Sequence, residues 1–80
     1  MTNVLRFSVQ CLNADSCTVY FEPEGGHVEL SRGEVIRVEM SGGNQHEDPE
    51  IAFVPDGIII GAWASAVTRA WDAKGTQLDI

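Results

Sequence analysis

The stretch that decides the fold runs from Val19 to Met40, VYFEPEGGHVELSRGEVIRVEM. It contains three runs in which apolar and polar residues alternate, separated by the turns Glu24-Gly25-Gly26 and Ser31-Arg32-Gly33-Glu34. This period of two predicts three β-strands, each with one buried face and one face in water. Pro23 ends the first strand because proline cannot donate a hydrogen bond to a central ladder. Gly33 gives the second turn a residue that tolerates a positive φ.

The alternation recurs on both sides of this stretch, and no segment shows a sustained helical period. Alanines between Trp63 and Trp71 favour a helix, but the β-branched alternation of Val67 to Asp72 favours a strand, which is expected there. Pro55-Asp56-Gly57 has the chemistry of a tight turn in which glycine tolerates a positive φ. Ile58 to Ile60 is apolar on both sides and is therefore expected to be a central strand. The other expected strands are Leu5–Cys11, Cys17–Glu22, His27–Leu30, Ile36–Met40, Ile51–Val54 and Thr76–Ile80.

These short strands follow one another at a spacing of about 8–12 residues, which is typical of sandwiches and small barrels. A chain of 80 residues has the length of one domain. We therefore expect a single all-β domain over residues 1–80. Its architecture is expected to be a small antiparallel β-sandwich or a partly open barrel of seven or eight short strands.

Part of the chain resembles a pattern of small bacterial proteins. A strand leads into Glu22-Pro23-Glu24-Gly25, and a short strand then leads into the Leu-x-x-Gly-Glu turn from Leu30 to Glu34 and a valine-rich strand. The pattern covers about a quarter of the chain. It resembles uncharacterised small bacterial β-sandwich proteins and the edges of cupredoxin-like or immunoglobulin-like domains. The resemblance implies a sandwich fold and a stand-alone bacterial domain, and it implies no activity and no site residues.

The net charge of the chain limits the classes of partner that it can bind. Twelve acidic residues against five basic ones give a net charge of −7. The basic residues are scattered along the sequence without a basic run; they are Arg6, Arg32, Arg37, Arg69 and Lys74. This balance argues against nucleic acid and anionic membranes, which both attract clustered Lys and Arg. It suits a basic protein partner, and it opposes close contacts between copies, so a monomer or a weak homodimer is expected.

The expected location is cytoplasmic, and the alternative is a mature or trimmed fragment of a secreted protein. The longest apolar run, Gly57 to Ala64, is far shorter than the ~20 residues needed to span a bilayer, and residues 1–6 lack the pattern of a signal peptide. In the cytosol, Cys11 and Cys17 would be reduced thiols that act as small apolar residues. The alternative is a disulfide across the turn-like Asn13-Ala14-Asp15-Ser16, because residues that face each other across a hairpin reach the required separation. The sequence leaves both states open.

Candidates for metal binding and catalysis are few. His46, Glu47, Asp48 and Glu50 cluster in or beside the loop from Ser41 to Pro49. Zinc needs three or four convergent ligands at defined spacing, and the sequence has neither His-x-His nor Cys-x-x-Cys. A solvated acidic loop with no metal and no other cofactor is therefore expected. The sequence also lacks a Gly-x-Ser-x-Gly elbow and a phosphate loop, which predicts a non-enzymatic protein. An enzyme would require His27, His46 and carboxylates to converge.

Aromatic residues offer a binding surface instead. Trp63 sits among the small residues Gly61, Ala62, Ala64 and Ser65, which would leave its indole accessible, whereas Trp71 is expected in the core. We therefore expect a small acidic, non-enzymatic protein-interaction domain, whose sheet edges can also pair with another chain. The alternative is a ligand-binding module for a carbohydrate or a metal that uses Trp63 and the loop 41–49. The expected contact residues are Trp63, His46, Glu47 and Asp48.

Overall fold

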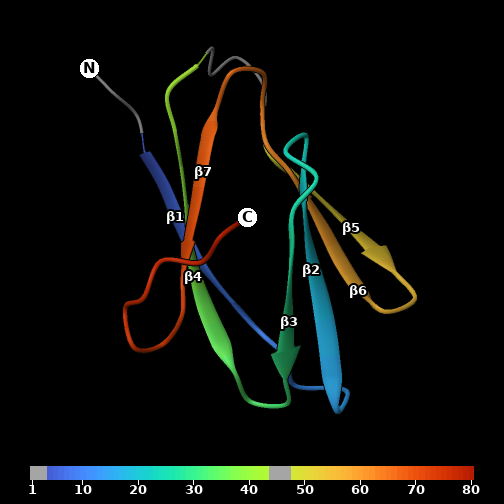
Figure 1. Cartoon of the computed structure of the whole chain (residues 1–80). Helices are drawn as coiled ribbons and strands as arrows, with labels where there is room; N and C mark the ends of the chain where they lie inside the picture. The colour runs from blue at the N-terminus through green and yellow to red at the C-terminus, as the bar shows by residue number, and fades with distance from the viewer. Residues whose placement is uncertain (1–3, 44–47) are drawn as a thin grey trace.

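A computed structural model describes residues 4–43 and 48–80, and these residues form seven strands and no helix (Figure 1). The prediction of an all-β fold is therefore confirmed. Each observed strand begins and ends within one residue of its expected bounds. No helix in the described part of the chain is long and apolar enough to cross a membrane. The strands are β1 (Val4–Gln10), β2 (Ser16–Glu22), β3 (His27–Ser31), β4 (Val35–Ser41), β5 (Glu50–Val54), β6 (Gly57–Gly61) and β7 (Val67–Trp71).

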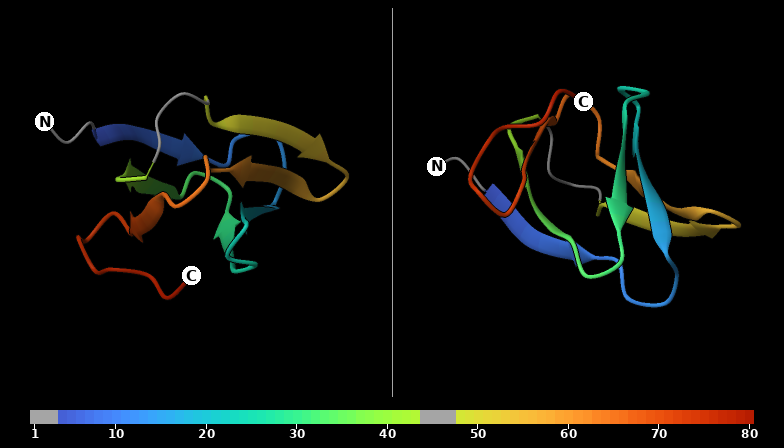
Figure 2. Two further views of the ribbon diagram at one scale, coloured as in Figure 1. Left: turned by 90° about the horizontal axis from the view of Figure 1, so that it is seen from above. Right: turned by 60° about the horizontal axis from the view of Figure 1, so that its bottom comes forward.

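The strands divide between two sheets that pack against each other (Figure 2). Sheet A has the order β1-β4-β7, and sheet B has the order β3-β2-β6-β5. The interior position of β6 confirms the prediction for its apolar sequence. The described strand pairs are antiparallel except for β2–β6, which is parallel. Neither sheet closes on itself, so the architecture is a sandwich rather than a barrel.

The stretch from Val19 to Met40 supplies strands to both sheets. β2 and β3 pair in sheet B, whereas β4 is the central strand of sheet A. The turn from Ser31 to Glu34 is thus a corner between the two sheets. Gly33 adopts a φ of 86° there, as its place in the turn predicts. The backbone N–H of Ser31 donates to the Glu34 carboxylate at 2.6 Å and fixes the corner.

The inward faces of the two sheets form one hydrophobic core. Alternation turns every second residue of each strand inward, so both sheets contribute at regular spacing. Full burial of such a side chain stabilises a fold by about 1.5–3 kcal/mol. The largest fully buried side chains are Ile36, Val38 and Met40 on β4, Val19 and Phe21 on β2, Ile60 on β6, and Cys11.

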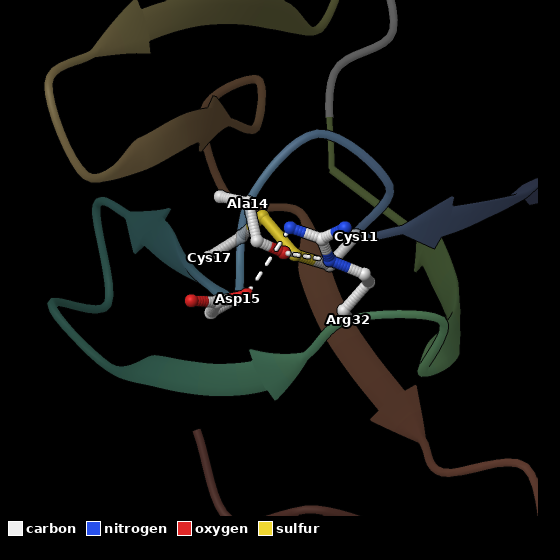
Figure 3. A network of polar contacts seen from close by, with 5 residues as sticks. All are labelled: Cys11, Ala14, Asp15, Cys17 and Arg32. Carbon is white, nitrogen blue, oxygen red and sulfur yellow. Dashed lines mark hydrogen bonds and ion pairs between the residues drawn. A yellow bond between two sulfur atoms is a disulfide. The ribbon is translucent and has the colours of Figure 1, made fainter.

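A disulfide closes the loop between β1 and β2. Cys11 and Cys17 are bridged, with their Cα atoms 5.8 Å apart, so the cysteines are not the reduced thiols of the cytosolic expectation. Arg32 binds the same loop, because its Nε donates to the carbonyl of Ala14 at 3.2 Å and its Nη2 pairs with Asp15 at 3.1 Å (Figure 3). These contacts tie the β1–β2 loop to the corner that follows β3.

Position 57 requires glycine, but for a different reason from the positive φ that the turn sequence predicts. It does not take a positive φ. Instead it lies opposite Thr18 in the parallel β2–β6 pair. A Cβ added at Gly57 would lie 1.8 Å from the carbonyl oxygen of Thr18, so only glycine allows this approach of the two strands.

The predicted terminal strand Thr76–Ile80 is wrong. Gln77 forms only an isolated bridge with Trp71. The Asp72 carboxylate accepts hydrogen bonds from the backbone N–H groups of Lys74 and Thr76, both at 2.9 Å, and this tightens the turn after β7. The chain then leaves sheet A, and the backbone of Ile80 lies against Gly26 beside sheet B. A segment that crosses from one sheet to the other cannot continue a ladder with β7.

Candidate functional site

The residues predicted to contact a partner or ligand are not brought together. His46 and Glu47 lie outside the described residues, and Asp48 is exposed. Within residues 4–43 and 48–80, no group of three or more His, Cys, Asp or Glu side chains is placed to hold a metal ion. The ring of His27 lies 6.0 Å from that of Tyr20, on the outer side of sheet B.

The expectation that the Trp63 indole is accessible is wrong, since the residue is only 5% exposed. Trp63 lies in the connection between β6 and β7, and its Nε1–H donates to the carbonyl of Gly42 at 2.6 Å. Its small neighbours therefore do not expose the indole. Trp63 ties the end of β4 to the β6–β7 connection and contributes to the core.

The core position expected for Trp71 is also wrong. In the register of β4 and β7, Ala70 lies opposite Val38 and is fully buried, so Trp71 points to the outer face of sheet A. It is half-buried there. Arg69, two residues earlier on the same face, was the signal for this orientation, because a charged residue in alternation with a tryptophan places both on the wet side.

The outer face of sheet A gathers arginines that are far apart in the sequence. Arg6 pairs with Glu39, which pairs with Arg69 across the sheet, and the next row contains Arg37 opposite Trp71. Glu39 accepts from Arg6 at 3.2 Å and lies 3.9 Å from Arg69. Three of the five basic residues of the chain thus share one face, which we call the arginine face. It contains Arg6, Arg37, Glu39, Arg69 and Trp71. A depression of about 400 Å³ on this face is lined by Arg6, Ser8, Arg37, Glu39 and Trp71, whereas Arg69 lies outside the lining.

A second surface is apolar and lies between the edge strands β1 and β5. Sheet A has three strands against four in sheet B, and the β5–β6 hairpin projects beyond sheet A (Figure 2). Phe53 and Ile51 pair with Ile58 and Ile60 and so belong to the inner face of sheet B, yet they are 89% and 55% exposed. We call this surface the open side. It consists of Leu5, Leu12, Ile51 and Phe53.

A groove of about 430 Å³ lies at the Leu12 and Phe53 end of the open side, and Leu5 and Ile51 do not line it. Leu12 and Ala14 line it from the β1–β2 loop, and Phe53, Pro55 and Ile58 line it from the β5–β6 hairpin. Sequence reasoning missed this surface. Ile51 and Phe53 occupy inner-face positions in the alternation of β5. They are exposed because sheet A has no strand opposite β5.

One titratable group near the groove is perturbed. The Tyr20 hydroxyl donates to the carboxylate of Asp56, and this hydrogen bond raises the pKa of Tyr20 above its ordinary 10.0. The negative charges of Asp56 and Glu29 act in the same direction, because they disfavour a tyrosinate. Tyr20 therefore stays protonated and holds the β5–β6 turn to β2.

Comparison with protein-family models, with curated proteins and with solved structures gives no match for this chain. Three surfaces of the described residues are the candidates for a function. These are the open side, the arginine face and the outer face of sheet B.

Proposed function

We propose that this chain is a small, non-enzymatic protein-interaction domain that binds an extended segment of a basic protein at its open side. The observation that carries the proposal is the exposure of Phe53, at 89%, on what should be the inner face of a sandwich. Exposed apolar side chains that adjoin one another mark binding surfaces in folded proteins. Phe53, Ile51 and Leu12 would form the apolar centre of such an interface.

Strand addition is the binding mode that fits the open side. β1 and β5 each end the strand order of their sheet, so one backbone edge of each has no neighbouring strand in the described residues. An extended partner segment can pair with such an edge and insert alternate side chains between the sheets. β1 contains no proline, and its one charged residue, Arg6, lies on the outer face of sheet A rather than between the sheets.

Charge supports a basic segment as the partner. Asp56 lines the groove. Glu50 begins β5, next to Ile51. With a net charge of −7, these carboxylates favour the approach of Lys and Arg and speed association.

The test uses short synthetic peptides with strict alternation of valine and a charged residue. We expect the lysine peptide to bind, with an affinity that falls as salt is added, because the rim charges are screened. A glutamate peptide of the same length should not bind. Proline at the centre of the lysine peptide should abolish binding, because it removes a ladder donor. Equal binding of the lysine and glutamate peptides would contradict the proposal.

A pair of variants locates the binding site on the domain. Phe53→Ser should weaken lysine-peptide binding by about tenfold, because loss of an interface aromatic costs more than about 1 kcal/mol. It should leave stability nearly unchanged, since the side chain is 89% exposed. Val67→Ser is the matched control, because Val67 is 48% exposed on the outer face of sheet A. Equal loss of affinity in both variants would refute the open side as the site.

The location of the domain decides which partners it can meet. We propose the cytoplasm, because the longest apolar run is far shorter than a membrane span. Cys11 and Cys17 would be reduced there and would form their bridge only under oxidising conditions. Thiol alkylation in intact cells, without reductant, is the test. Modified Cys11 and Cys17 support the cytoplasm, whereas protected cysteines place the domain in an oxidising compartment.

A further inference from the structure

The arginine face is a second surface, independent of the proposed protein-interaction function, and its charge is opposite to that of the chain. Three of the five basic residues converge there, against one of the twelve acidic residues, Glu39, as far as the described residues show. Opposite residues on neighbouring strands have Cβ atoms about 5 Å apart, and diagonal neighbours are about 7–8 Å apart. Arg37 is diagonal to both Arg6 and Arg69, so the three arginines form one cluster, of which Arg6 and Arg37 line the depression.

The arginines of this face are not equivalent. Arg6 and Arg69 both contact Glu39, which holds their side chains over the centre of the sheet. Arg37 forms no ion pair with any residue that the structure describes. Its row continues to Ser8 on one side and to Trp71 on the other. Arg37 therefore carries the uncompensated positive charge, between a hydroxyl and an indole.

We propose that the arginine face binds an acidic saccharide. A pyranose ring would stack on the half-buried indole of Trp71, which offers a flat apolar surface. The carboxylate of the sugar would accept hydrogen bonds from the Arg37 guanidinium, whose planar fork matches a carboxylate. Ser8 would bind a ring hydroxyl. The depression of about 400 Å³ has the volume of a small-ligand site.

Size and charge favour a saccharide over a nucleic acid. A polyanion longer than the arginine face would meet the remaining surface, which is strongly acidic because eleven of the twelve carboxylate side chains lie elsewhere in the sequence. A short acidic ligand contacts the arginines alone. Trp71 supplies a single stacking surface in the depression, which suits one sugar ring.

Calorimetry with four probes tests the ligand class. The first is a tetrasaccharide of alternating glucuronic acid and N-acetylglucosamine, and the second is the neutral N-acetylglucosamine tetrasaccharide. Sodium sulfate and a single-stranded oligothymidylate are the third and fourth. We expect the acidic tetrasaccharide to bind most tightly and to change the tryptophan fluorescence, with the change lost in Trp71→Leu. No binding, or equal binding of the neutral sugar, overturns the proposal. Sulfate or oligothymidylate binding as tightly as the acidic sugar overturns it as well.

Variants then place the site. Arg37→Gln should weaken binding of the acidic tetrasaccharide by about tenfold, because a charge-assisted hydrogen bond is lost. Arg32→Gln is the matched control, since Arg32 lies at the corner after β3 and its loss should leave binding unchanged. Trp71→Leu keeps an apolar side chain but removes the stacking surface, so it should also weaken binding while thermal unfolding stays cooperative. Unchanged affinity in Arg37→Gln, with the fold intact, overturns the assignment.

Discussion

Replacement of Gly57 by alanine tests the closest contact in sheet B. The added Cβ would lie 1.8 Å from the carbonyl oxygen of Thr18 and 2.8 Å from its carbonyl carbon and its nitrogen. Cβ atoms are essentially never found within 3.0 Å of another heavy atom, so the two strands must separate by about 1 Å at this point. The atoms involved are backbone, and no side chain can rotate to relieve the clash.

The expected loss of stability follows from what the separation breaks. Overpacking alone costs about 1–3 kcal/mol. The hydrogen bond from the Thr18 N–H to the carbonyl of Asp56, at 2.8 Å, joins β2 to the residue before Gly57 and would be lost as well. Each buried backbone bond contributes about 1 kcal/mol. We therefore expect Gly57→Ala to lower the free energy of unfolding by about 2–4 kcal/mol. A domain of this length has only about 4–12 kcal/mol in total.

Gly61→Ala is the control, because Gly61 lies in the same strand and a Cβ there meets nothing closer than 3.7 Å. We expect its free energy of unfolding to stay within about 0.5 kcal/mol of the parent. Urea unfolding followed by circular dichroism measures both variants, with the slope of the transition checked for two-state behaviour. If the free energies of unfolding of Gly57→Ala and Gly61→Ala differ by less than about 1 kcal/mol, the close approach of β2 and β6 is wrong.

Two further predictions concern single groups. Tyr20 is the only tyrosine, so tyrosinate absorbance reports its titration alone; Asp56→Asn should lower its raised pKa towards 10.0. The pKa of Tyr20 is higher in the folded state than in the unfolded state, so the hydrogen bond stabilises the fold below the ordinary tyrosine pKa. This stability is lost as the pH rises through the raised pKa. An unchanged Tyr20 pKa in Asp56→Asn would show that the hydrogen bond is not the main cause of the shift. Replacing Cys11 and Cys17 together by alanine should lower the free energy of unfolding by about 2 kcal/mol, because the bridge closes a short loop in the unfolded chain. If alkylation without reductant leaves the mass of the parent protein unchanged, the bridge is confirmed. A mass increase for two alkylated cysteines would contradict it.

Sequence reasoning succeeded where the signal was local. Alternation located all seven observed strands in the described residues, and the Gly33 turn has the φ that its position requires. It was wrong where orientation depends on a distant partner. Trp63 is buried because Gly42, more than twenty residues away in sequence, accepts its N–H bond. Trp71 faces outward because β7 pairs with β4 in a register that turns Ala70 inward.

The surfaces show the same division. The arginines looked scattered because Arg6, Arg37 and Arg69 belong to different strands, and only the pairing of β1, β4 and β7 brings them to one face. Phe53 has the sequence position of an inner-face residue. Its exposure depends on how many strands the opposite sheet contains.

The β class, the strand bounds and most of the turns can be predicted from the sequence, because they depend on side-chain alternation and backbone preferences within a few residues. Tertiary structure alone decided which strands share a sheet, which side of each strand meets water, and why Gly57 must be glycine. The physical reason is that these properties arise from contacts between strands far apart in the chain, and alternation specifies two faces without saying which one another sheet will cover.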